Sequence, residues 1–102
     1  MVGVILWSEL ARDDLRKVVE YIAQNNPAAA RGMGYRLIAA VESLQEFPRR
    51  ARVVPEYGRD NLREVIVGSY RVVVQLNASA TTITVVRIWH AARGFPEIPP
   101  AE

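Results

Sequence analysis

Residues 62–76 read LREVIVGSYRVVVQL and predict a β-hairpin. Two runs rich in β-branched residues flank Gly68 and Ser69, and a glycine followed by serine suits a two-residue type II′ turn. That turn would place Val67 opposite Tyr70, which fixes the pairing of the two strands. One face of the hairpin is then almost wholly apolar, and the other carries Arg71 among mixed side chains. We therefore expect the apolar face to meet the core and Arg71 to point away from it.

Two helices are predicted upstream of the hairpin. Residues 9–25 carry apolar side chains at a 3.6-residue period, and Ser8 suits the N-cap position before them. A second helix is expected at 27–47, with Asn26 as its N-cap and a proline at its first position. Pro48 is expected to end this helix, because the residue before a proline is pushed out of helical space.

Three further strands complete the expected fold. The apolar run at 2–7 predicts a strand buried on both faces, which suits a central position in a sheet. Residues 53–55 predict a short strand, and residues 82–89 are apolar on both faces and predict an internal strand. The expected class is α+β, with an N-terminal strand and a two-helix hairpin packed on a small antiparallel sheet in the order β-α-α-β-β-β.

The loop after Leu76 sets the register of the last strand. A loop of three residues would place Arg87 opposite Arg71 on the outer face of the sheet, together with Trp89. A loop of four residues would turn Arg87 into the core, which is costly unless the charge is paired. We therefore expect the three-residue loop.

Size and composition exclude several classes of protein. The chain has 102 residues, which predicts one domain, here 1–93, followed by a proline-rich tail at 94–102 that is extended or frayed. It has no cysteine, which excludes disulfide scaffolds, zinc–thiolate sites and thiol catalysis, and a single histidine predicts no metal site. No apolar run approaches the roughly 18 residues of a membrane span. We expect a cytoplasmic protein with no membrane contact, cofactor or small-molecule ligand.

The positive charge gathers in the second half of the chain. Residues 49–93 hold eight arginines against three acidic residues, a net charge of +5, whereas residues 1–48 have a net charge of −1. Such a cluster predicts a surface for an anion or an acidic partner, although one solvated face is also normal in an antiparallel sheet. The side chains expected on the outer sheet face or its rim are Arg59, Arg63, Arg71, Arg87, His90 and Arg93, with Glu56 and Glu64 nearby.

His90 is the one side chain of the sequence suited to proton transfer near neutral pH. It could act as a general base toward a ribose 2′-hydroxyl, with Glu56 as an alternative base and Arg71 bracing the phosphate. The competing interpretation is a histidine at a strand end with one backbone hydrogen bond, and it is the simpler one.

The chain resembles the ParE/RelE superfamily of toxins from type II toxin–antitoxin modules, also called plasmid stabilisation proteins. The resemblance covers residues 3–93 and implies the fold reached above. It rests on WS at 7–8, ARDDL at 11–15, YIA at 21–23, NPAAA at 26–30, LQEFP at 44–48, REVIVGSYRVV at 63–73 and VVRIWHAAR at 85–93.

The resemblance implies two possible activities. RelE-like members are ribosome-dependent mRNA endonucleases, and Arg71 matches a catalytic arginine of that branch, with Arg93 near a second. That branch also uses central lysines and a C-terminal tyrosine, but no lysine follows Lys17 here and Phe95 stands near the tyrosine position. Another nuclease subgroup uses a glutamate, an arginine and a histidine, roles that Glu56, Arg71 and His90 could fill.

The pattern as a whole looks more like the ParE branch, which inhibits DNA gyrase. The resemblance then implies a toxin that binds gyrase and is neutralised by a cognate antitoxin, expected to be a ParD-like ribbon-helix-helix protein. Residues 1–7, with Leu10 and Val19, offer apolar surface for that antitoxin. A ribosome-dependent endonuclease and a non-toxic partner-binding scaffold are the alternatives. Candidates for binding the target or the antitoxin are Arg59, Arg63, Arg71, Arg87, Trp89 and Arg93.

Overall fold

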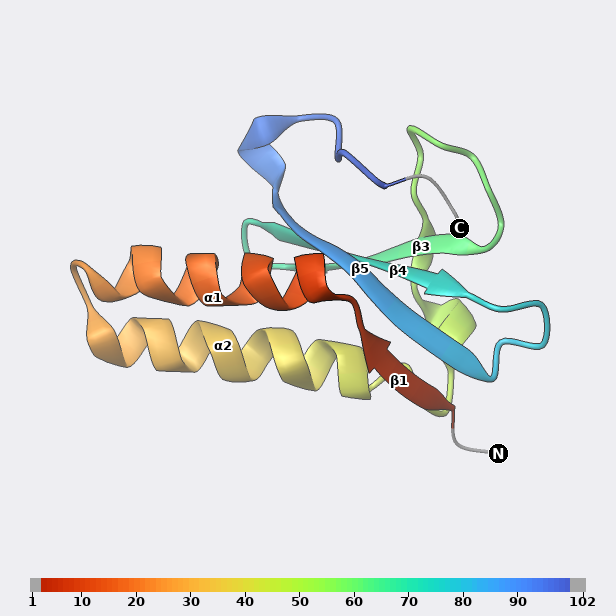
Figure 1. Cartoon of the computed structure of the whole chain (residues 1–102), viewed down its shortest axis with the longest axis horizontal. Coiled ribbons are helices and arrows are strands. Elements are labelled where there is room, and N and C mark those ends of the chain that lie inside the picture. Colours follow the sequence, from red (N-terminus) through yellow and green to blue (C-terminus); the bar gives the residue numbers. More distant parts are fainter. Residues whose placement is uncertain (1–2, 100–102) are drawn as a thin grey trace.

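Residues 3–99, the part of the chain that the computed structural model describes, form a five-stranded sheet covered on one face by two α-helices (Figure 1). The α+β class is confirmed. The sheet is mixed rather than antiparallel, because β1 runs parallel to β5, and its strand order is β1-β5-β4-β3-β2. The elements are β1 (Val4–Trp7), α1 (Glu9–Ala23), α2 (Pro27–Glu42), the 3₁₀ turn η1 (Pro48–Arg50), β2 (Arg52–Val53), β3 (Leu62–Val67), β4 (Tyr70–Leu76), β5 (Thr82–His90) and the 3₁₀ turn η2 (Ala91–Arg93).

The two helices begin where the sequence predicts. The Ser8 side chain accepts a hydrogen bond from the backbone N–H of the third helical residue of α1, and Asn26 does the same for α2. The end of α2 differs from the prediction, because the helix stops at Glu42 and Pro48 opens η1 instead. After Glu42 the chain tightens into a turn in which Leu44 N–H bonds to the carbonyl of Val41 and Gln45 N–H to that of Glu42. The carbonyl of Gln45 accepts a hydrogen bond of 2.8 Å from Gly3 N–H, which ties this turn to the start of β1.

The central hairpin has the predicted pairing. Gly68 has a φ of +57°, the left-handed value that a type II′ turn needs at its first position, and Val67 pairs with Tyr70. The face with Val67 and Tyr70 packs against the helices. Arg71 therefore lies on the outer face, as expected.

The last strand follows neither of the two expected registers. Residues 78–81 form a four-residue loop, because Asn77 N–H bonds to the carbonyl of Thr82. A β-bulge at Val86 then adds one residue to β5, so that Val85 pairs with Val74 while Arg87 pairs with Val73. Arg87 and Trp89 lie on the outer face as expected, but it is Trp89, not Arg87, that pairs with Arg71.

The position of β1 corrects another expectation. This strand is at the edge of the sheet rather than in its centre, and Val4 and Leu6 are 57% and 50% exposed. Ile5 and Trp7, on its other face, pack against the core. An apolar run cannot distinguish a strand buried on both faces from an edge strand whose outer face remains available to a partner. The internal position of β5 between β1 and β4 is confirmed.

The C-terminal tail crosses the outer face of the sheet (Figure 1). The Tyr57 hydroxyl donates a hydrogen bond of 2.8 Å to the carbonyl of Pro96, and the Tyr57 and Phe95 rings meet edge to face. Ile98 packs against a small apolar cluster of Val54, Leu62 and Val73. Within 94–99 the tail is therefore extended but not frayed, because it covers apolar surface that the outer face would otherwise expose.

Candidate functional site

Arg71 is the centre of a buried polar network on the outer face. Its Nε donates to Glu64 on β3 at 2.6 Å, and its two terminal nitrogens donate to the two oxygens of Glu56 at 2.6 and 2.8 Å. One of these nitrogens also reaches the carbonyl of Gly94 in the tail, at 3.3 Å. The Arg71 side chain is only 8% exposed and that of Glu64 is fully buried. All three guanidinium nitrogens are therefore engaged within the protein.

Each charged group in this network stabilises the ionised form of its neighbours. Arg52 donates to the second oxygen of Glu64, so that this buried carboxylate lies between two arginines. Hydrogen bonding to Arg71 lowers the pKa of Glu56 from 4.5 to about 2. The same two carboxylates raise the pKa of Arg71. At neutral pH Glu56 is an anion with both oxygens hydrogen-bonded to Arg71, and in this state it is a poor proton acceptor.

Glu56, Arg71 and His90 do not form one site. Glu56 and Arg71 bind each other, but His90 pairs with Tyr70, and adjacent residues of a strand point to opposite faces. The His90 ring meets the Tyr70 ring edge to face at 5.1 Å, on the helix side of the sheet. Its Nδ1 accepts a hydrogen bond of 3.0 Å from Ala92 N–H, as the simpler sequence interpretation predicted.

The expected arginine surface is divided among several environments. Arg63 shares the face of Val67, not of Arg71, which corrects its expected position, and it binds Asp60 and the carbonyl of Ala51. Arg59 lies exposed in the loop after β2.

Arg87 and Arg93 both lie over the buried ring of Trp89. The guanidinium carbon of Arg87 is 4.9 Å from the ring centroid, and that of Arg93 is 3.8 Å from it.

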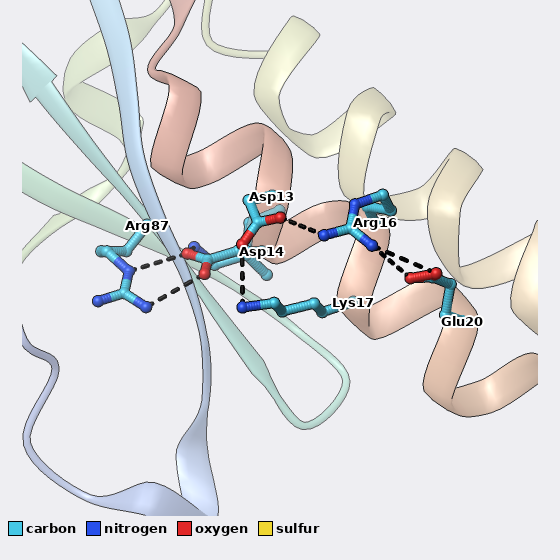
Figure 2. A network of polar contacts seen from close by, with 7 residues as sticks. Asp13, Asp14, Arg16, Lys17, Glu20 and Arg87 are labelled. Atoms are coloured by element: carbon cyan, nitrogen blue, oxygen red, sulfur yellow. Dashed lines mark hydrogen bonds and ion pairs between the residues drawn. The ribbon is translucent and has the colours of Figure 1, made fainter.

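The sequence interpretation missed Asp14, which connects α1 to β5 (Figure 2). Its carboxylate accepts hydrogen bonds from Arg87 Nε at 2.8 Å, Arg87 Nη2 at 3.1 Å and Ile88 N–H at 2.9 Å. Asp14 lies three residues after Ala11 and four before Val18, so it belongs to the buried stripe of the helix. A carboxylate on that stripe was the signal for a buried cationic partner.

Two classes of site find no support in the described residues. No helix within 3–99 combines the length and the apolar character that crossing a bilayer requires. The same residues contain no group of three or more histidine or acidic side chains placed to hold a metal ion.

The sequence matches a known toxin family and its members. Residues 5–95 match the family described as the ParE toxin of type II toxin–antitoxin systems, parDE. Toxin RelE2 of Caulobacter vibrioides is 38% identical over 90 residues, which cover 87% of this chain and 96% of that protein. Toxin RelE1 of the same species is 30% identical over 90 residues, which cover 88% of this chain and 95% of that protein.

Solved structures of similar fold include both branches of the superfamily. A chromosomal ParDE system from P. aeruginosa gives a TM-score of 0.70 at 16% identity, covering 87% of this chain and 96% of that one. An E. coli RelE variant in the free state gives a TM-score of 0.67 at 17% identity, covering 92% of this chain and 88% of that one. A chain of the RelBE2 toxin–antitoxin complex of Mycobacterium tuberculosis gives a TM-score of 0.56 at 20% identity, covering 88% of this chain and 99% of that one. By sequence and by fold, this chain belongs to the ParE/RelE superfamily of toxins from type II toxin–antitoxin systems.

Proposed function

We propose that this toxin acts by binding and inhibiting DNA gyrase, and that a cognate ParD-like antitoxin neutralises it. The state of Arg71 carries the proposal. A nuclease of this superfamily needs a guanidinium that is free to hold the scissile phosphate. Here Arg71 is nearly buried and binds Glu56, Glu64 and the carbonyl of Gly94. In this state Arg71 maintains the structure of the outer face and is not available to a substrate.

The remaining groups of a nuclease are also poorly placed. Glu56 is held as an anion by Arg71, and His90 lies on the opposite face of the sheet. No lysine follows Lys17 in the sequence. Phe95 has no hydroxyl and packs against Tyr57. Inhibition by binding requires none of these groups, so the arrangement favours a toxin that recognises its target without cleaving it.

Of the five candidate arginines, two remain available for recognition in this proposal. Arg59 and Arg93 are exposed, whereas Arg63, Arg71 and Arg87 are engaged in ion pairs, and Trp89 is covered. We propose Arg59 and Arg93 as contacts for the target or the antitoxin. The antitoxin would cover the exposed apolar side chains of Val4, Leu6 and Leu10.

A supercoiling assay tests the proposal. Purified toxin is incubated with gyrase, ATP and relaxed plasmid, and in parallel with ribosomes translating a defined mRNA whose ends are mapped by primer extension. We expect supercoiling to stop or cleaved DNA to accumulate, and the mRNA to stay intact. Toxin premixed with the antitoxin is the control and should restore supercoiling. Unaffected supercoiling at micromolar toxin would overturn the proposal.

A ribosome-dependent mRNA endonuclease is the second candidate, because both curated relatives are named RelE toxins. It would use Glu56, Arg71 and His90, and would require Arg71 to leave its carboxylates on the ribosome. This candidate predicts codon-positioned cuts that are lost in His90→Ala and Arg71→Ala, with circular dichroism verifying that each variant is folded. If expression without the antitoxin is harmless, the chain is a partner-binding scaffold or an inactivated toxin, and it has neither activity.

A further inference from the structure

The exposed side of α2 carries little charge. Its exposed residues are uncharged apart from Arg31, Arg36 and Glu42, whereas the exposed side of α1 holds several ion-paired side chains. Two large side chains on α2 lie in solvent, Tyr35 at 72% and Ile38 at 38% exposure. The helix runs along the margin of the molecule, where a second protein can reach it (Figure 1).

An apolar groove of about 210 Å³ borders these two side chains. It lies between the helices and is lined by Leu15, Val19, Ala30, Arg31, Gly34, Tyr35 and Ile38. Ligand pockets measure roughly 300–1,000 Å³, so this groove is smaller than a typical ligand requires. It is of a size to take one large side chain from a protein partner.

Four residues form a line along α2 that is complementary to itself. Arg31, Tyr35, Ile38 and Glu42 are separated by four, three and four residues, which is the spacing of the seam between two helices packed side by side. This α2 seam has a cation at its N-terminal end, two apolar side chains in its middle and an anion at its C-terminal end. The midpoint of the two charged residues, between positions 36 and 37, is also the midpoint of the two apolar ones.

A second copy of α2 matches the seam when it packs antiparallel to the first. A two-fold axis through the midpoint brings each Arg31 opposite Glu42 of the second copy, and each Tyr35 opposite Ile38. The Tyr35 ring of one copy then reaches the groove that Ile38 lines in the other. Parallel packing would bring like charges together at both ends, so the charges select the antiparallel arrangement.

Both charges of the seam are available for this contact. Arg31 and Glu42 are exposed, and neither takes part in an ion pair within residues 3–99. A different protein would have to present the same order of charges in reverse around an apolar centre. The chain itself supplies that order.

We infer that α2 binds α2 of a second copy of this chain and forms a symmetric antiparallel homodimer. Only two large apolar side chains per copy lie in the seam, so the interface is at the small end of specific complexes and the dimer dissociates in the micromolar range. Exposed ion pairs contribute little affinity, and their effect here is to fix register and orientation. The dimer does not depend on which target the toxin has.

Charge reversal tests the pairing. Sedimentation velocity of the full-length toxin, from low micromolar to submillimolar concentration, measures self-association. Arg31→Glu and Glu42→Arg should each weaken the dimer about tenfold, because like charges then meet at both ends of the seam. A mixture of these two variants should associate as the unmodified protein does, since one chain is then acidic at both ends and the other is basic at both ends.

Matched controls locate the interface. Arg36→Glu makes the same charge change on the same helix, but the Arg36 guanidinium lies beside Gly68 at the β3–β4 turn, so self-association should not change. Ile38→Glu should abolish the dimer, and circular dichroism verifies that each variant is folded.

Three results would overturn the inference: a toxin that stays monomeric over the whole concentration range, a dimer that Arg31→Glu leaves intact, or a mixture of the two charge variants that does not associate. A fourth is that Ile38→Glu abolishes binding of the antitoxin but not self-association, because this face of α2 then belongs to the antitoxin.

Discussion

Replacing Asp14 with asparagine should destabilise the entire fold. The carboxylate of Asp14 is 9% exposed and faces an Arg87 side chain that is 12% exposed. It accepts two hydrogen bonds from Arg87 and one from the backbone of Ile88 (Figure 2). Asparagine has the same shape but no charge and one acceptor oxygen. Arg87 would then be a nearly buried cation without a carboxylate, and its other contacts are the carbonyl of Glu97 and the Trp89 ring.

The expected cost follows from this burial. Removing one partner of a buried ion pair costs about 3–5 kcal/mol, because the remaining charge is uncompensated. That is a large part of the 5–15 kcal/mol typical of a domain's total stability. In a domain of this size, each kcal/mol lowers the melting temperature by about 4–8 °C, so a loss of about 12 °C or more is expected.

Urea unfolding followed by tryptophan fluorescence and by circular dichroism measures the effect. Asp13→Asn is the matched control, because Asp13 is the preceding residue and pairs with Arg16 and Lys17 on the exposed side of the same helix. Its unfolding midpoint should stay close to that of the unmodified protein. A double variant, Asp14→Leu with Arg87→Met, should recover part of the loss, since neither charge is then left alone. If Asp14→Asn unfolds at the same urea concentration as Asp13→Asn, the reasoning is wrong.

Three further predictions concern the outer face and the hairpin. Arg71 lowers the pKa of Glu56 from 4.5 to about 2 in the folded state, so the ion pair stabilises the fold fully above pH 4.5 and loses this effect as the pH falls toward 2. Glu56→Gln removes the titrating group and should flatten the melting temperature measured as a function of pH over this range. Arg71→Met should lower the urea-derived stability by about 3–5 kcal/mol, because the buried Glu64 loses one of its two arginines. Gly68→Ala should cost about 1–2 kcal/mol in the same assay, because alanine is strained at a φ of +57°, and an unchanged midpoint would contradict the assigned turn.

The predictable parts of the fold were those fixed by neighbours in the sequence. The caps at Ser8 and Asn26 and the turn at Gly68 depend on a few adjacent residues, and all three were correct. The sequence favoured a three-residue loop because that register kept Arg87 out of the core. The bulge at Val86 was not foreseen, because it lets a four-residue loop place Arg87 on the outer face as well, and both faces of β5 are apolar. The edge position of β1 escaped prediction for a similar reason, since an apolar run is compatible with several places in a sheet.

The candidate site was predictable in composition but not in arrangement. The sequence indicated that Arg71 and Glu64 share the outer face, and they do. That face was expected to be solvated, but the tail and the loop carrying Glu56 cover it, and such long-range contacts leave no periodic signal. The pairing of Arg87 with Asp14 spans 73 residues, so only the fold could bring these two charges together.

The parallel pairing of β1 with β5 bears on the order in which the molecule can assemble. Residues 4–7 are synthesised well before their partners at 82–85. The helical hairpin can form early from local contacts, but the strands that it must cover arrive afterwards. Until β5 has emerged from the ribosome, β1 has no strand to pair with and the sheet face that the helices cover is incomplete. A surface that depends on the finished sheet therefore forms only after β5 has paired with β1 and β4.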